Sequence, residues 1–170
     1  MEPAASRRAY PGSFVSVDVE SWPGLPDHEI VRHLGAAGVL PVLPSGEVLL
    51  VRQFRPAIRD ALTEIPAGVL DVAGEDALTC AARELFEETG YRHETIEFLG
   101  GYYSSAGFTD EYVHLFLART APEPEGPPED GIELRVEPFG RMVAAARAGR
   151  VRDVKTALAL LLAAERPSVV

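Results

Sequence analysis

The chain has 170 residues and a formal net charge of −10, which argues against general nucleic-acid binding because that activity requires a basic surface. Hydrophobic residues make up 46% of the chain and charged residues 25%, as in an ordinary globular domain with a sizeable core. The longest apolar run, residues 157–164, is too short to cross a bilayer, no signal peptide is visible, and the single cysteine rules out an intrachain disulfide. We therefore expect one main domain in the cytoplasm, with no nucleic-acid or membrane partner.

The N-terminal part of the chain divides into a leader and a small β unit. Residues 1–12 have the composition of a flexible leader. Apolar and polar residues alternate from Val15 to Glu20, which predicts a strand, and residues 29–34 could form its hairpin partner. We expect residues 13–35 to form a β appendage ahead of a main domain at 36–170.

The remaining segments alternate between strands and helices. A short extended piece is expected at 63–65, and helices are expected at 138–148 and 153–166, the last capped by Asp153 and ended by Pro167. Longer strands are predicted at 36–43, 48–54, 95–104, 112–119 and 132–136. This order of elements predicts an α/β sandwich with a mixed sheet.

A central helix is predicted between Asp76, a suitable N-cap, and Gly90, a suitable C′ residue. Its apolar residues recur at the spacing of one helical face, so we expect that face to pack on the core. The predicted face consists of Leu78, Ala82, Leu85 and Thr89, flanked by Ala81 and Phe86.

The opposite side of this helix carries Glu84, Glu87 and Glu88. Three carboxylates on one stripe repel each other, and a hard divalent cation would relieve that repulsion. The alternative is a solvated acidic face. The glycine-containing loop before the helix favours a cradle for a metal-bound diphosphate. Cys80, one turn before Glu84, is expected to be a small residue near the rim, since hard cations prefer oxygen ligands.

The stretch from Arg83 to Tyr91, R-E-L-F-E-E-T-G-Y, matches the end of the Nudix box, and Glu75 stands eight residues before Arg83, as that box requires. The segment between Gly68 and Glu75 is one residue longer than the family pattern. The chain therefore resembles the Nudix hydrolase superfamily. This resemblance implies a Nudix-type α/β/α sandwich with a mixed sheet, here preceded by the small N-terminal β appendage.

Stretches outside the box resemble the ADP-ribose pyrophosphatase group of that superfamily: Val51–Pro56, Glu64–Gly68, Gly107–Glu111 and Asp153–Thr156. Ala106 stands where that group usually has proline, a marker of ADP-ribose specificity. The resemblance implies hydrolysis of a nucleoside diphosphate linked to another moiety, with ADP-ribose giving AMP and ribose 5-phosphate. Other nucleotide sugars, nucleoside triphosphates and a non-catalytic nucleotide sensor are the alternatives.

The resemblance also assigns the metal ligands. Glu84 and Glu88 are expected to hold Mg²⁺ or Mn²⁺, and Glu87 to bind a second ion directly or through water. The backbone carbonyl of Ala67 is the expected ligand from the loop. Arg83 is expected to be structural and to tie the loop to the helix by ion pairs.

Substrate-binding residues are expected outside the helix: Trp22, Arg52, Arg55, Glu64, Gly107 and Phe108. The two arginines would bind the diphosphate, with ordinary surface ion pairs as the alternative. In the resembling group the N-terminal strands exchange between two protomers, which implies a homodimer in which Trp22 and Ile30 reach the partner's base pocket.

The general base is expected on an acidic loop late in the chain. Glu129 or Asp130 is the first candidate for base or extra metal ligand, and Glu133 is the next. The alternative is a solvated loop without a catalytic role.

Overall fold

Three antiparallel strands form a small N-terminal sheet, in the order β1 (Ala5–Pro11), β2 (Val15–Ser21) and β3 (His28–His33). The prediction of a flexible leader at 1–12 was wrong, because β1 lies within it. Every residue of β1 is exposed, so backbone pairing with β2 orders this strand rather than burial of side chains. The computed structural model describes residues 1–166, so the predicted stop at Pro167 and the predicted domain end at residue 170 lie outside the described residues.

A seven-stranded sheet forms the centre of the molecule. Its main path runs in the order β10 (Glu133–Pro138), β5 (Glu47–Arg55), β4 (Ala36–Val42), β9 (Tyr112–Thr120) and β8 (His93–Tyr103). Two short strands complete it: β6 (Asp60–Glu64) pairs with β5, and β7 (Ala67–Val69) pairs with β4. Because β4 and β9 are parallel while the other pairs are antiparallel, the sheet is mixed, as predicted.

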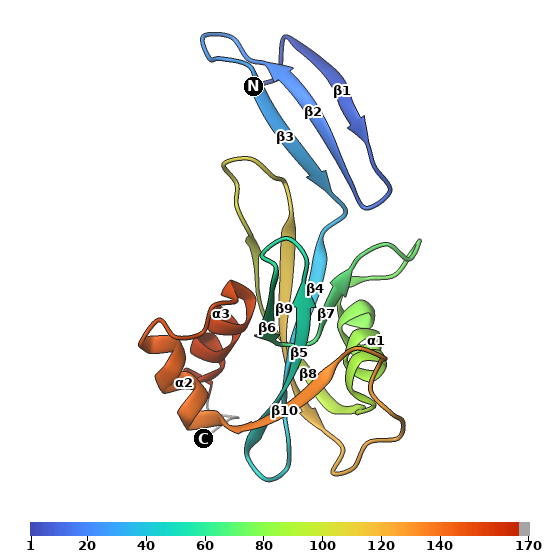
Figure 1. Ribbon diagram of the computed structural model, residues 1–170, viewed down its shortest axis with the longest axis vertical. Helices are drawn as coiled ribbons and strands as arrows, with labels where there is room; N and C mark the ends of the chain where they lie inside the picture. Colours follow the sequence, from blue (N-terminus) through green and yellow to red (C-terminus); the bar gives the residue numbers. More distant parts are fainter. Residues whose placement is uncertain (167–170) are drawn as a thin grey trace.

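Helices cover both faces of this sheet (Figure 1). Helix α1 (Ala77–Thr89) lies on one face, and α2 (Phe139–Arg147) with α3 (Val154–Ala163) lies on the other. The α/β/α sandwich is thereby confirmed, and the small sheet projects from one end of it (Figure 1). Within residues 1–166, no helix is long and apolar enough to span a membrane.

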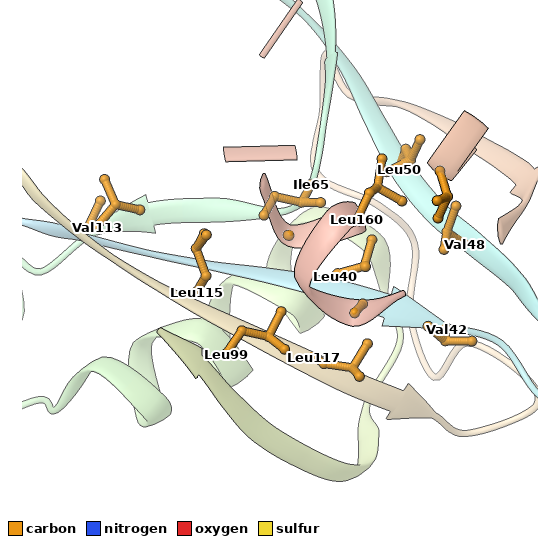
Figure 2. Close-up of a cluster of buried hydrophobic side chains, with 14 residues drawn as sticks. Leu40, Val42, Val48, Leu50, Ile65, Leu99, Val113, Leu115, Leu117 and Leu160 are labelled. Carbon is orange, nitrogen blue, oxygen red and sulfur yellow. The ribbon is translucent and has the colours of Figure 1, made fainter. Parts of the chain in front are cut away.

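The larger core cluster lies between the sheet and α3, where Leu40, Leu50 and Leu160 are fully buried (Figure 2). A second cluster lies under α1 and contains Ala81 and Leu85. Strand β4 is buried along its whole length because both of its faces are covered. The first cluster therefore packs α3 against one face of the sheet, and the second packs α1 against the other.

The buried face of α1 differs from the predicted face in the first turn. Ala81, Leu85 and Thr89 are buried as expected, but Leu78, in the first turn, is 44% exposed. The first fully buried residue of α1 is Cys80, although Ala77 already packs against the same cluster. The prediction was wrong for Leu78 because spacing along a helix does not reveal where its partner sheet ends.

Candidate active site

The ends of α1 are set by the two residues that the sequence indicated. The Asp76 carboxylate accepts a hydrogen bond of 2.8 Å from the backbone N–H of Thr79, an N-cap. Gly90 has a left-handed φ of 77°, and a Cβ there would lie 2.0 Å from the carbonyl oxygen of Gly126. Both caps are confirmed, and they fix which residues face the neighbouring loop.

We predicted that the acidic stripe would lie opposite the buried face of α1. In the structure it borders that face instead. Exposure rises across the stripe: Glu88 is 6% exposed, and the side chains of Glu84 and Glu87 are 13% and 51% exposed. Glu88 is inward because it shares the face of Leu85 and Thr89. The helix thus presents one buried, one nearly buried and one exposed carboxylate to the loop before it.

The backbone of β7 lies directly against the two inner carboxylates. Glu88 Oε2 accepts a hydrogen bond of 3.1 Å from the N–H of Ala67. A Cβ on Gly68 would lie 1.9 Å from Glu84 Oε1, so only glycine leaves room for that carboxylate. Ala67, the predicted loop ligand, therefore lies beside the predicted helix ligands.

Burial makes the charged forms of both inner carboxylates costly. It raises the pKa of Glu88 to about 8, against the opposing effect of the Ala67 hydrogen bond. Burial also raises the pKa of Glu84, although Arg83 acts in the opposite direction. Closely spaced carboxylate oxygens beside a small backbone cradle are the donor set that a hard divalent cation prefers. The residues present therefore fit such an ion.

Among residues 1–166, no three acidic, histidine or cysteine side chains converge into a ready-made metal cage. Arg83 lies among the helix carboxylates instead, and its Nη1 donates to Glu84 Oε1 at 2.6 Å and to Glu87 Oε2 at 2.8 Å. A cation at this site would take over carboxylate oxygens that a guanidinium now neutralises.

Arg83 also binds the loop before the helix, as predicted. Its Nε and Nη2 donate to Glu75 Oε1 and Oε2 at 2.9 and 3.0 Å. The loop turns tightly at Gly74, with a φ of 82°, and the N–H of Glu75 donates to the carbonyl of Val72 at 3.1 Å. The longer segment between Gly68 and Glu75 therefore still delivers Glu75 to Arg83.

Cys80 lies behind this cradle, with its Sγ 3.6 Å from the carbonyl oxygen of Val69 and 3.6 Å from Arg83 Nη2. Burial raises the pKa of its thiol to about 12, with the charge of Glu84 acting in the same direction. The thiol is therefore neutral, which suits a packing role and disfavours a role as nucleophile or ligand.

A second group of charged side chains joins β5, β6 and the start of α3. Arg55 Nε and Nη2 donate to Glu64 Oε1 and Oε2 at 2.6 and 3.0 Å, and Glu64 is only 2% exposed. Lys155 Nζ lies 3.2 Å from the same Glu64 Oε2 and 2.8 Å from Asp153 Oδ1. Two cations and two carboxylates alternate here, so each buried charge has a partner.

Asp153 anchors this network to the fold. Its Oδ2 accepts hydrogen bonds from the N–H and the hydroxyl of Thr156 at 2.9 and 2.6 Å, which caps α3. The Thr156 hydroxyl in turn accepts the N–H of Ile65 at 2.8 Å. Burial lowers the pKa of Lys155, but the charges of Asp153 and Glu64 outweigh it and raise that pKa overall.

One cavity of about 360 Å³ joins this charged network to the backbone of β7. It is lined by the predicted residues Arg55, Glu64 and Ala67 and by Gly68, which separates it from Glu84. Residues that were not predicted as site residues also line it: His33, Glu111, Asp153 and Lys155. The signal that could have found Lys155 is a lysine at the start of an otherwise apolar helix.

The other predicted aromatic and loop residues line a separate cavity of about 340 Å³, where Trp22 faces Gly107 and Phe108. The loop is fixed to β3 because Asp110 accepts hydrogen bonds from the N–H of His33 at 2.8 Å and from Arg32 Nη1 at 3.0 Å. Within this chain, these residues therefore do not join Arg55 in one cavity.

The late acidic candidates differ in their surroundings. Glu133 forms ion pairs with Arg52 at 3.3 Å and with Arg135 at 2.6 Å, so the alternative of a surface ion pair describes Arg52. The negative charge of Glu129 contributes to the raised pKa of both Glu84 and Glu88. Of the three candidates, Glu129 is thus electrostatically linked to the carboxylate pair.

Comparison with known proteins extends this description. A family model for the NUDIX domain matches residues 32–157. An ADP-ribose pyrophosphatase from Bacillus subtilis (strain 168) is 47% identical over 90 residues, which cover 53% of this chain and 48% of that relative. A GDP-mannose pyrophosphatase from Cronobacter sakazakii is 35% identical over 153 residues, which cover 79% of each. The match thus spans about half the length of the first relative and four fifths of the second.

A methanol dehydrogenase activator from Bacillus methanolicus is 37% identical over 139 residues, which cover 78% of this chain and 73% of that relative. The crystal structure of an ADP compounds hydrolase has the same fold, with a TM-score of 0.77 and 17% sequence identity, and covers 96% of this chain and 92% of that one. The structural likeness agrees with the α/β/α sandwich described above.

Proposed function

Because the chain belongs to the NUDIX domain family, we propose that it is a divalent-metal-dependent hydrolase of nucleoside diphosphates linked to a second moiety. The favoured substrate is ADP-ribose, cleaved to AMP and ribose 5-phosphate. The observation that carries this proposal is the inward-facing pair Glu84 and Glu88, set against the backbone of Ala67 and Gly68 and next to a cavity whose lining includes Arg55 and Lys155.

Each group has a role in the proposed reaction. Glu84 and Glu88, together with the Ala67 carbonyl, would hold Mg²⁺ or Mn²⁺, and Glu87 would hold a second ion directly or through water. When bound, such a cation would supply positive charge to the phosphoryl oxygens and lower the pKa of a water molecule. Arg55 directs its remaining N–H groups at the diphosphate, as a guanidinium paired on one side can still do on the other.

Glu129 is the proposed general base that accepts the proton of the attacking water. Its charge acts on the carboxylate pair, and its place in an exposed loop allows it to approach a bound substrate. Asp130 and Glu133 are the next candidates. Glu133 would first have to leave its ion pairs with Arg52 and Arg135.

A GDP-linked sugar is the second candidate substrate. Two observations favour it: Ala106 stands where the ADP-ribose-specific group usually has proline, and a GDP-mannose pyrophosphatase matches 79% of the chain. Both substrates contain a nucleoside diphosphate joined to a sugar, so the same catalytic groups serve either one.

The proposal also includes a homodimer in the cytoplasm. In such a dimer the base of the nucleotide would stack in the cavity of Trp22 and Phe108, with Gly107 allowing close approach. The mass of the protein in solution, measured by light scattering, tests the dimer. A monomer at all concentrations would remove that part of the proposal.

The function is tested with a panel of ADP-ribose, GDP-mannose and nucleoside triphosphates, each incubated with Mg²⁺ and analysed by mass spectrometry. We expect AMP and ribose 5-phosphate from ADP-ribose, and loss of that activity in Glu84→Gln and Glu88→Gln. Glu94→Gln, on the exposed part of β8, is the matched control and should remain active. No turnover of any diphosphate would overturn the enzyme proposal, and turnover of triphosphates alone would overturn the substrate.

A further inference from the structure

The largest of the described cavities, about 460 Å³, lies away from the carboxylate pair, between β6 and the segment that joins α2 to α3. Three of its lining residues are arginines, Arg141, Arg150 and Arg152, and Thr63 adds a hydroxyl group. Its volume falls in the range of small-molecule sites. This cavity differs from the proposed active site in both its position and its charge.

The guanidinium groups of this cavity are only partly used by the protein. Arg141 donates to Glu137 at 2.8 Å and Arg152 to Asp60 at 2.7 Å, each through Nη1. Each guanidinium has five N–H donors, so both retain free donors. Among the described residues, Arg150 forms no ion pair or side-chain hydrogen bond.

The charge of the cavity contrasts with the rest of the chain. Three arginines against two carboxylates leave a local excess of one positive charge, in a chain whose formal net charge is −10. An unpaired guanidinium beside further guanidinium donors and a hydroxyl is the arrangement that recognises phosphate. The remaining wall is apolar and includes Met142 and Val151, which suits the organic part of a phosphorylated molecule.

We propose that the cavity between β6 and the α2–α3 segment is a second anion site, which binds a phosphate monoester through Arg150, Arg152, Arg141 and the Thr63 hydroxyl. The shared ligand chemistry is a phosphate dianion, either free or carried by a nucleoside monophosphate. The site stands independently of the proposed hydrolysis, because its residues include none of the groups assigned to that reaction.

The position of β6 places this site next to the proposed active site. Leu62 contributes to both cavities, and Glu64, at the end of the same strand, belongs to the network of Arg55 and Lys155. A ligand in the arginine-lined cavity would therefore contact the strand that carries Glu64.

The test is a titration of the full chain with inorganic phosphate, AMP and adenosine, in EDTA so that no divalent ion is present. We expect saturable binding of phosphate and AMP at millimolar concentrations or below, with NMR shifts at the amides of Thr63 and Val151. Arg150→Met should weaken binding by at least about tenfold, the loss typical of one charged hydrogen bond. Because the side chain of Arg150 has no partner among the described residues, this variant should fold normally.

Arg147→Met is the matched control, since Arg147 is an exposed arginine of α2 outside the cavity, with one distant ion pair at 3.8 Å. Its dissociation constants should equal those of the wild type. Tighter binding of AMP than of phosphate would identify the ligand as a nucleotide, and equal binding would identify it as free phosphate. The proposal is overturned if adenosine binds as tightly as AMP, if Arg150→Met binds normally, or if the shifts centre on Gly68. Failure of the hydrolysis panel would not affect this result, because the titration contains neither metal nor diphosphate.

Discussion

The guanidinium of Arg83 and the carboxylate of Glu75 meet through two parallel hydrogen bonds of 2.9 and 3.0 Å. Through them, one residue of α1 holds the loop that precedes the helix. The same guanidinium donates to Glu84 and Glu87, so one side chain compensates three carboxylates. The position of the loop before α1 and the charge of the acidic stripe therefore both depend on Arg83.

We expect Arg83→Lys to lower the thermal unfolding midpoint by several degrees in EDTA, because a lysine keeps the charge but cannot bind Glu75 with two parallel bonds. Differential scanning calorimetry measures the change. Arg141→Lys, in an exposed pair with Glu137, is the control and should change the midpoint little. Equal midpoints for wild type and Arg83→Lys would contradict the structural role of Arg83.

Gly68→Ala should lower kcat/KM by about 100-fold, because a displacement of about 1 Å in a reacting group has an effect of that size. The new Cβ would occupy the place of Glu84 Oε1, at 1.9 Å, and must push that carboxylate away. Gly140→Ala is the control, since no atom lies within 4 Å of its Cβ position and alanine favours a helix. Wild-type activity in Gly68→Ala would show that Glu84 does not need its present position.

Glu129→Gln should lower kcat by about 100-fold or more while KM changes little, as expected for loss of a general base. Steady-state kinetics over a range of pH separates the two parameters, and the slope on the acidic side should flatten. Asp130→Asn removes a neighbouring charge and serves as the comparison. If the loss occurs in Asp130→Asn instead, the base is Asp130, and if neither variant changes kcat, the loop has no catalytic role.

Asp153→Asn should lower the free energy of unfolding by about 1–3 kcal/mol near neutral pH, the usual value of a hydrogen bond to a charged group. Burial alone would raise the pKa of Asp153, but Lys155 and the hydrogen bonds from Thr156 outweigh it, so this pKa lies below its usual value. The stabilisation is therefore complete above the usual pKa of about 4 and is lost as the pH falls through the lower folded-state pKa.

Urea unfolding at about pH 6 and about pH 3 checks this dependence. The difference between wild type and Asp153→Asn should shrink at the lower pH. Asp71→Asn, at an exposed loop position, should equal the wild type at both values. If the difference in free energy of unfolding between wild type and Asp153→Asn grew at the lower pH, the pKa of Asp153 would be raised and not lowered by folding.

The sequence by itself determined the elements whose signals are local. Asp76 and Gly90 bound α1 because capping depends on residues within one turn. The contact between Arg83 and Glu87 follows from helical spacing, and the family pattern indicated that between Arg83 and Glu75. The five strands on the main path of the large sheet were recognisable for the same reason, since alternation and apolar runs are local patterns, whereas β7 was not predicted.

Only the tertiary structure decided which flank of α1 is buried. Periodicity fixes the angles between Glu84, Glu87 and Glu88 on the helix, but their burial depends on where β7 and the sheet lie. Strand β1 was missed for a related reason. Its backbone pairs with β2, but its side chains are exposed and show no pattern that would predict a strand.

Tertiary structure also decided which distant residues meet. Arg55, Glu64 and Lys155 form one network although 91 positions separate the last two, and no local pattern encodes such a contact. Arg52 lies in the same segment as Arg55 and had the same predicted role. It pairs with Glu133 instead, because β10 lies beside β5 at that point. The acidic helix could therefore be predicted from its own residues, whereas the cavity it borders exists only through strands and helices that the fold brings together.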